Sequence, residues 1–300
     1  QLAPRIREIT DELLAAVAPA GRTDLIADLA YPLPVIVIAE ILGVPPKDRA
    51  AFKRWSDVVV AGLGTGVSSE RENGGMTPRE LPMATIEEMR AYFDAVVDAR
   101  QREPQVDLIS ALLAAEVAGE KLSREEILTF CILLLVAGNE TTTNLIGNAV
   151  RTLLEHPDPF ARLRAEPALW PAAVEEVLRY RPPVQATVRQ AVEDVEIHGE
   201  TVKAGQPVIV WLASANRDAS EFPDPDVFEI TRTPNRHLSF GHGIHFCLGA
   251  PLARLEAAIA LEEIGRRLPD LRRADDAPLE QVPGFIMHGV KHLPLEFTPA

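Results

Sequence analysis

The sequence predicts a mainly α-helical protein with a smaller β region, and three observations support this fold class. Apolar residues recur at three- and four-residue spacing through most of residues 1–180. One helical pattern continues without interruption from Ser123 to His156. After Pro182-Pro183 the pattern changes to short alternating runs separated by turn residues, which is typical of strands. We therefore expect one domain over residues 1–300, mostly helical to residue 180 and mixed over 181–300.

The helices before residue 120 can be placed from periodicity and end signals. Pro46 suits a first helical turn, where its missing N–H is harmless, and Asp107 is a candidate N-cap for a short helix. Glycine and proline are frequent over residues 61–82, which predicts a mobile surface loop. Longer helices are expected over residues 6–17, 35–42, 46–60 and 85–102.

The long central helix has the clearest start signal. Ser123 and Glu126 form the S-x-x-E pattern of a capping box. About 30 residues at 1.5 Å each give a helix of roughly 45 Å, long enough to cross a whole domain. Residues 132–136 are apolar on all sides, so we expect this stretch to be buried all round.

The second half mixes strands, irregular chain and a final helix. A helix is expected from Pro171 to just before Pro182, and Gly199-Glu200 is the expected turn of a hairpin. Residues 216–236 are rich in Pro, Asp and Arg, which predicts an irregular but ordered segment. Strands are expected over 184–189, 195–198, 201–203 and 287–297, and a helix over 247–267.

Composition excludes several classes of partner. Thirty basic and 44 acidic residues give a net charge of -14, which argues against nucleic acid. The longest unbroken apolar run, residues 131–137, is far shorter than the roughly 20 residues that span a bilayer, so we expect no membrane. Cys131 and Cys247 are the two cysteines, too few for a disulfide framework, and a reducing cytoplasm is the expected location.

The segment 240–249, Phe-Gly-His-Gly-Ile-His-Phe-Cys-Leu-Gly, is the most informative in the chain. Gly241 and Gly243 allow a tight turn or a close approach to a flat ligand. Cys247 stands where a helix is expected to begin, and the positive end of a helix dipole favours a thiolate.

Three interpretations of this segment compete with a functional thiolate. A dinucleotide fingerprint needs G-x-G-x-x-G, and here the third glycine comes too late. A zinc site could use His242, His245 and Cys247, but a fourth ligand at the usual spacing is missing. A lone cysteine can also be an inert, buried small side chain.

The same ten residues resemble the haem-binding loop of cytochrome P-450, F-x-x-G-x-x-x-C-x-G, at Phe240, Gly243, Cys247 and Gly249. The resemblance implies haem b with Cys247 as the axial iron ligand, Phe240 near the sulfur, and Gly241 and Gly249 beside the cofactor. It also implies that His245 donates a hydrogen bond to a haem propionate.

A second motif lies within the long helix, at residues 137–142, Ala-Gly-Asn-Glu-Thr-Thr. Glycine and threonine are poor helix formers, so they indicate either a helix–helix contact or a local widening over a ligand. The motif resembles the family's [AG]-G-x-[DE]-T-[TS]. The resemblance implies that Glu140 and Thr141 deliver protons to dioxygen, and that Ala137 and Gly138 lie beside the haem.

Two further matches follow in the family's order. Glu176 and Arg179 resemble its E-x-x-R pair, and Arg232 resembles the arginine that joins them, which implies a structural role for all three. An acid–base pair at this spacing is otherwise usually solvated. Arg189 resembles a propionate ligand, because a guanidinium matches a carboxylate bidentately; a surface arginine is the alternative.

The resemblance implies the cytochrome P-450 fold and a bacterial monooxygenase that inserts one oxygen atom of O2 into an organic substrate. Electrons would come from NAD(P)H through a ferredoxin system. The pocket walls expected by family position are apolar, which favours a largely apolar substrate; core packing is the alternative for each. They are Leu134, Val184, Ala186, Ile286 and Met287, together with Ala137.

Two other functions stay open at this point. One is a haem- or substrate-binding protein without turnover, including an inactive fragment; the other is a haem enzyme that uses peroxide. The Glu140–Thr141 pair argues against the peroxide enzyme, which needs no oxygen-activating relay. Family members are usually longer, and the motifs of their N-terminal quarter are not found, so we expect this sequence to be a piece of a longer protein.

Overall fold

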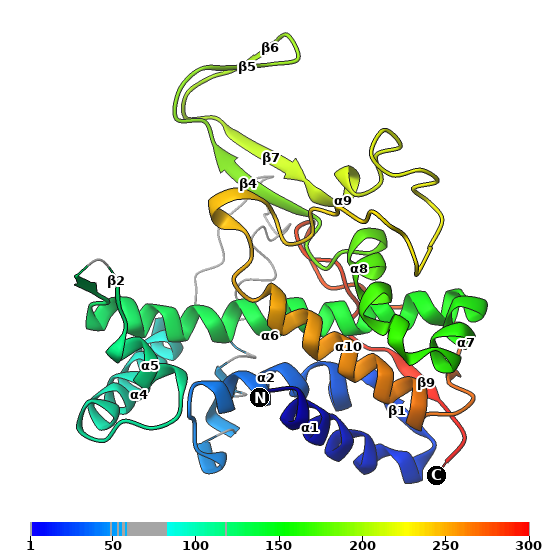
Figure 1. Ribbon diagram of the computed structural model, residues 1–300, viewed down its shortest axis with the longest axis horizontal. Helices are drawn as coiled ribbons and strands as arrows, with labels where there is room; N and C mark the ends of the chain where they lie inside the picture. Colours follow the sequence, from blue (N-terminus) through cyan, green and yellow to red (C-terminus); the bar gives the residue numbers. More distant parts are fainter. Residues whose placement is uncertain are drawn as a thin grey trace, which may run out of the picture.

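The computed structural model describes residues 2–48, 50–52, 54, 55, 58, 83–117 and 119–299. Its central element is α6, Arg124–Glu155, which crosses the middle of the molecule in Figure 1. The predicted capping box is present: the Ser123 hydroxyl accepts from the amide of Glu126 at 3.2 Å, and the Glu126 carboxylate accepts from the amide of Ser123 at 2.7 Å. The helix therefore starts where the sequence indicates.

The other helices pack around α6. In Figure 1, α1 and α2 lie on one side of α6, and the β4–β7 sheet stands on the other. α10 contacts α6, α8 and α1, so it joins the helices that form the larger apolar core. The bounds are α1 Leu2–Val17, α2 Pro32–Ile41, α4 Met83–Arg102, α5 Leu108–Ala114, α7 Pro157–Ala165, α8 Trp170–Tyr180, α9 Leu212–Ala215 and α10 Ala250–Arg267, with short 3-10 or π turns at Ala18–Ala20, Ile26–Ala30, Pro46–Asp48, Pro167–Leu169 and Gly243–His245.

The strands form small antiparallel sheets. β4 pairs with β7 from Ala186↔Trp211 to Gln190↔Pro207, and Figure 1 shows the β5–β6 hairpin projecting beyond this pair. Near the C-terminus, β9 lies between β1 and β8. The bounds are β1 Arg22–Asp24, β2 Glu116–Val117, β3 Glu120–Lys121, β4 Ala186–Gln190, β5 Val195–Ile197, β6 Glu200–Val202, β7 Pro207–Trp211, β8 Arg272–Arg273 and β9 Pro294–Glu296.

Most of the predicted elements are present, with differences at their ends. Asp107 caps α5 by accepting from the amide of Ser110 at 2.8 Å. The hairpin turn is His198-Gly199, one residue earlier than predicted, because Gly199 supplies the left-handed φ of +84°. The final helix begins at Ala250, three residues after Cys247. The predicted loop over residues 61–82 lies outside the described residues.

Two predictions were wrong. The middle of α6 is not buried all round, since Leu133 is 56% exposed while its neighbour Leu135 is fully buried. An apolar stretch shows what can be buried, but neighbouring elements decide which face is covered. The long terminal strand is reduced to β9, and the chain before it makes only single bridges, Val184↔Met287 and Gln281↔Val290.

Candidate active site

The loop before α10 holds Cys247 in a defined turn. The amide of Cys247 donates to the carbonyl of Phe240 at 2.9 Å, which closes the loop on itself. Gly241 and Gly243 have φ angles of +73° and +75°, in the left-handed region where glycine alone is unstrained. A Cβ at Gly249 would lie 3.9 Å from the Cys247 sulfur, so the sulfur sits close to the backbone that enters α10.

The structure separates the competing interpretations of this loop. Cys247 is exposed, whereas Cys131 is buried, so Cys247 is not an inert core side chain. Among the described residues, no three His, Cys, Asp or Glu side chains gather in a group that could hold a metal ion. Between residues 212 and 242 there is no strand, so the strand–turn–helix context of a dinucleotide fingerprint is missing too.

The surroundings of Cys247 fit a flat, apolar ligand that carries iron and carboxylates. Ile244, Phe246 and Leu248 are 98%, 52% and 72% exposed, an unusual concentration of large apolar side chains on a surface. His245 is exposed in the same turn and offers a ring nitrogen to an anionic group. An accessible thiol ahead of a helix, with apolar neighbours, is the donor set that a haem needs.

The motif in α6 divides between two faces of the helix. The Thr141 hydroxyl donates to the carbonyl of Ala137 at 2.8 Å, on the exposed face. Glu140 is half-buried, and desolvation raises the pKa of its carboxyl above the usual range. A Cβ at Gly138 would lie 2.6 Å from the Ile38 side chain of α2, which supports the helix–helix interpretation for this residue.

Residues 137–142 remain α-helical, so no break in the helix marks the local widening that was one of the two interpretations of this motif. Contacts outside the helix offset the poor helix propensity of its threonines. The Thr143 hydroxyl, for example, donates to the carbonyl of Ala30 at 3.1 Å. The tertiary structure thus keeps the helix regular where propensity alone favours a break.

Glu176, Arg179 and Arg232 meet in a buried network. Arg179 donates twice to the Glu176 carboxylate, at 2.8 Å each, and both side chains are fully buried. Arg232 approaches the same carboxylate at 3.3 Å. The pair is therefore not the solvated ion pair that its spacing alone suggests.

This network also holds the irregular segment that precedes the cysteine loop. Arg179 donates to the carbonyls of Asn216, Pro225 and Val227 at 3.1, 2.7 and 3.0 Å. The amide of Glu229 donates to the Glu176 carboxylate at 2.8 Å. The buried Glu176–Arg179 pair thus contributes several of the hydrogen bonds that hold residues 216–232, which have little regular structure.

The remaining predicted residues lie at the β4 end of the molecule or on α6. Val184 bridges Met287, and the amide of Gln185 donates to the carbonyl of Ile286 at 2.7 Å, so these predicted pocket walls are adjacent. Ala186 is fully buried, and Leu134 packs against the smaller apolar core. Arg189 is exposed on β4, and its guanidinium donates to the carbonyl of Val188 at 3.0 Å.

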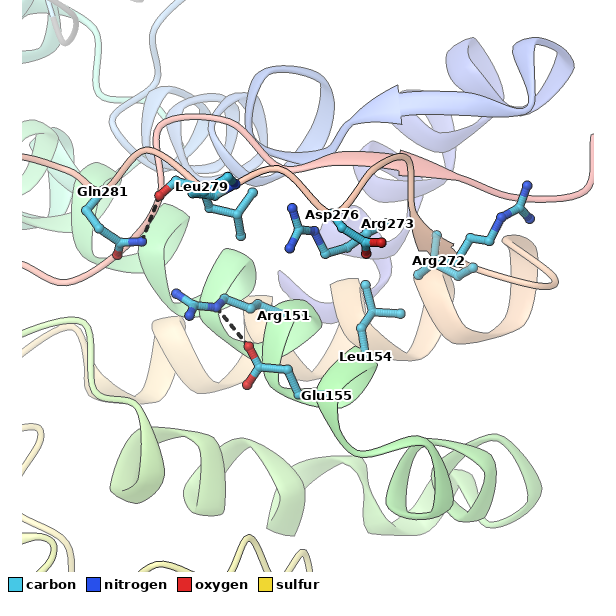
Figure 2. Close-up of a pocket in the computed structure, with 10 residues that line it drawn as sticks. Arg151, Leu154, Glu155, Arg272, Arg273, Asp276, Leu279 and Gln281 are labelled. Atoms are coloured by element: carbon cyan, nitrogen blue, oxygen red, sulfur yellow. Dashed lines mark hydrogen bonds and ion pairs between the residues drawn. The ribbon is translucent and has the colours of Figure 1, made fainter.

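Cys247 lines neither of two cavities formed by the described residues. One of about 600 Å³ opens beside the C-terminal end of α6, where Figure 2 shows Arg151 bonded to Glu155 across from Arg273 and Asp276. A second, of about 460 Å³, includes Met287. Both linings mix charged or amide side chains with apolar ones, so the site is assigned from the cysteine loop and α6 instead.

Sequence reasoning missed a group of side chains around the cysteine loop. Arg254 of α10 donates to Glu175 of α8 at 2.7 and 2.8 Å, and the His237 ring contacts the same carboxylate at 3.1 Å. Neither spacing nor periodicity links these positions. The one signal in the sequence was Glu175, the acidic residue directly before the E-x-x-R pair.

α6 is the one helix among the described residues that is long and apolar enough to cross a membrane by length and composition. Half of its most apolar window is buried inside the protein. The core helix of a soluble protein passes the same test, so this feature is weak evidence for a membrane span.

Comparisons with known proteins agree with this site. Residues 65–268 match the family model "Cytochrome P450". The putative cytochrome P450 YjiB of Bacillus subtilis is 47% identical over 97% of this chain and 72% of its own length. The cytochrome P450 monooxygenase PikC of Streptomyces venezuelae is 45% identical over 99% of the chain and 69% of its own length.

Solved structures show the same similarity. CYP109Q5 from Chondromyces apiculatus has a TM-score of 0.91 at 47% identity, covering 100% of this chain and 72% of that one. CYP109E1 from Bacillus megaterium, solved with testosterone, has a TM-score of 0.90 at 44% identity, covering 98% and 78%. The chain belongs to the cytochrome P450 family. Its predicted fold is confirmed, and its activity is that of a monooxygenase.

The buried network around Arg179 leads to a stability prediction. Arg179→Met removes the buried counter-charge and two hydrogen bonds from the Glu176 carboxylate and one donor from each of three carbonyls, so we expect a loss of about 3–5 kcal/mol in the free energy of unfolding. Urea unfolding followed by circular dichroism measures it. Arg162→Met is the matched control, because the Arg162–Glu166 pair is exposed and its loss should cost below about 1 kcal/mol. Equal losses in the two variants would contradict the structural role.

Proposed function

We propose that Cys247 is the thiolate ligand of a haem b in this monooxygenase. The observation that carries the proposal is the exposed thiol in a loop closed by the Cys247–Phe240 backbone hydrogen bond, just before α10. Haem iron held by a thiolate supplies the activation of dioxygen, since the anionic sulfur donates electron density to the metal. Phe240, Gly241 and Gly249 shape the space around the sulfur, and His245 and Arg189 supply donors for propionates.

Glu140 and Thr141 are proposed to hold and move the proton that oxygen activation needs. The Thr141 proton is directed to the Ala137 carbonyl, which leaves the lone pairs of its hydroxyl oxygen free to accept a hydrogen bond. Burial raises the pKa of the Glu140 carboxyl above its usual range, which favours its protonated form relative to an exposed carboxyl. We propose that the carboxyl and the hydroxyl together hold a proton and pass it on beside Ala137.

The proposed substrate is a small, largely apolar organic molecule. Val184, Ile286 and Met287 form adjacent apolar positions at the β4 end of the site, and Leu134 and Ala137 lie on α6. Similar structures were solved with testosterone and with a hexadecenoyl group on an acyl carrier protein. Both ligands have extended apolar portions, which supports the same chemical class here.

Electrons are proposed to come from NAD(P)H through a ferredoxin system, in the cytoplasm. The relatives that support this proposal are bacterial P450s. A haem- or substrate-binding protein without turnover is the alternative outcome, and catalytic turnover with a supplied ferredoxin and reductase would exclude it.

The thiolate assignment predicts the spectrum of the reduced, CO-bound holoprotein. We expect the red-shifted Soret band of the family, and we expect Cys247→Ala to abolish it because the anionic sulfur is lost. Cys131→Ala is the matched control: Cys131 is buried, which raises the pKa of its thiol to about 12, so the band should be unchanged. A red-shifted band that survives in Cys247→Ala would contradict the assignment of Cys247 as the iron ligand.

The proton relay predicts a loss of coupling. In Thr141→Ala the hydroxyl is gone, so we expect the product formed per NADPH to fall several-fold while NADPH consumption continues. Thr141→Ser keeps the hydroxyl and should retain most of the coupling. Product and NADPH are measured together, with surrogate ferredoxin and reductase and a substrate chosen by its spectral shift. Unchanged coupling in Thr141→Ala would remove Thr141 from the relay.

A further inference from the structure

Arg254 and His237 both contact the ring of Phe240 in the cysteine loop. The guanidinium carbon of Arg254 lies 4.5 Å from the centroid of the Phe240 ring, within cation–π distance. The His237 ring lies 6.0 Å from the same centroid, and its side chain is almost fully buried. Phe240 thus contacts both a cation and an imidazole.

Glu175 holds both of these neighbours. Its carboxylate accepts two hydrogen bonds from Arg254, at 2.7 and 2.8 Å, and lies 3.1 Å from the His237 ring. Burial would raise the pKa of Glu175, but the hydrogen bonds from His237 and Arg254 lower it to about 2. The carboxylate therefore stays charged at any working pH and fixes α8, α10 and the loop to one another.

The link from this group to the sulfur is both mechanical and electrostatic. The carbonyl of Phe240 accepts the amide hydrogen of Cys247 at 2.9 Å, so the position of Phe240 sets the position of the cysteine. The pKa of Arg254 is raised mainly by its hydrogen bond to Glu175, and the attraction of Cys247 adds to it. The guanidinium lies on the ring of the residue that accepts the Cys247 amide hydrogen, so its charge is held close to the cysteine loop.

We propose that Arg254, anchored by Glu175, is a positioning residue that holds Phe240 beside Cys247 and places a fixed positive charge near the metal site. This inference rests on the proposed ligation by Cys247. Arg254 then has two separable effects. Its planar guanidinium, bound twice by Glu175, orders the loop, and its charge raises the reduction potential of the bound iron. A plain structural clamp between α8 and α10 would do neither.

The sign of the charge effect follows from electrostatics. Reduction of the iron removes one positive charge from the site, so a nearby cation favours the reduced state. Loss of the Arg254 charge should make the potential more negative. Lysine keeps the charge but loses the bidentate geometry and the planar stacking on Phe240. Arg254→Lys and Arg254→Met thus separate the two effects.

The test compares the wild-type holoprotein with Arg254→Met, Arg254→Lys and Arg162→Met. Arg162→Met is the control, because it removes the same charge from an exposed pair with Glu166. Potentials are measured by titration with dithionite and mediator dyes. In Arg254→Met we expect the ferrous-to-ferric ratio at a fixed potential to fall roughly threefold or more. At 59 mV per tenfold change in this ratio, the reduction potential becomes more negative by about 28 mV or more. Arg254→Lys and Arg162→Met should stay near the wild type.

Hydrogen exchange of residues 240–249, followed by mass spectrometry, tests the positioning. Exchange of this segment should be several-fold faster in Arg254→Met, in Arg254→Lys and in Glu175→Gln, and unchanged in Arg162→Met. If Arg254→Met does not fold, Arg254→Gln supplies the neutral variant. A potential in the neutral variant that equals that of Arg162→Met would overturn the charge effect, and unchanged exchange in Arg254→Lys would overturn the positioning.

Failure of the proposed ligation has a different signature. A wild-type holoprotein without the red-shifted CO band would refute the thiolate itself, whatever the potentials of the variants. The exchange measurement on the haem-free chain would still decide whether Arg254 orders the loop, because its contacts to Glu175 and Phe240 involve this chain alone.

Discussion

The buried ion pair between Glu176 and Arg179 is the interaction on which the rest of the site depends. Two charges without exposure are costly to desolvate, and the arrangement is stable only because their hydrogen-bonding groups are used within the protein. Arg179 serves Glu176 and three backbone carbonyls at once. Arg179 of α8 thereby helps to hold the irregular segment 216–232, which forms no strand hydrogen bonds of its own.

The order imposed there passes to the cysteine loop through Asn216. Its carbonyl accepts from Arg179, its side chain accepts from the amide of Leu238 at 2.7 Å, and its amide donates to the hydroxyl of Ser239 at 2.8 Å. Ser239 in turn donates to the carbonyl of Leu178 at 2.6 Å. The next residue is Phe240, whose carbonyl closes the loop around the cysteine. A chain of specific polar contacts thus runs from the core of α8 to the thiol.

The sequence predicted the features that are encoded locally. The capping box at Ser123, the N-cap at Asp107 and the cysteine motif depend on residues a few positions apart, so they are visible in a single sequence. Which face of α6 is buried, and the close packing of Gly138 against α2, depend on elements far away in the sequence. Strand β7 and the Glu175–Arg254–His237 contacts were missed for the same reason: their partners are tens of residues away.

Resonance Raman spectroscopy of the ferric holoprotein tests the central claim, that Cys247 ligates the iron, most directly. In a Cys131→Ser chain, Cys247 is the single remaining cysteine, so labelling with ³⁴S-cysteine marks only that sulfur. The account predicts an iron–sulfur stretching band that moves to lower wavenumber in the labelled protein. A spectrum without such a band, or a band that labelling leaves in place, would contradict it.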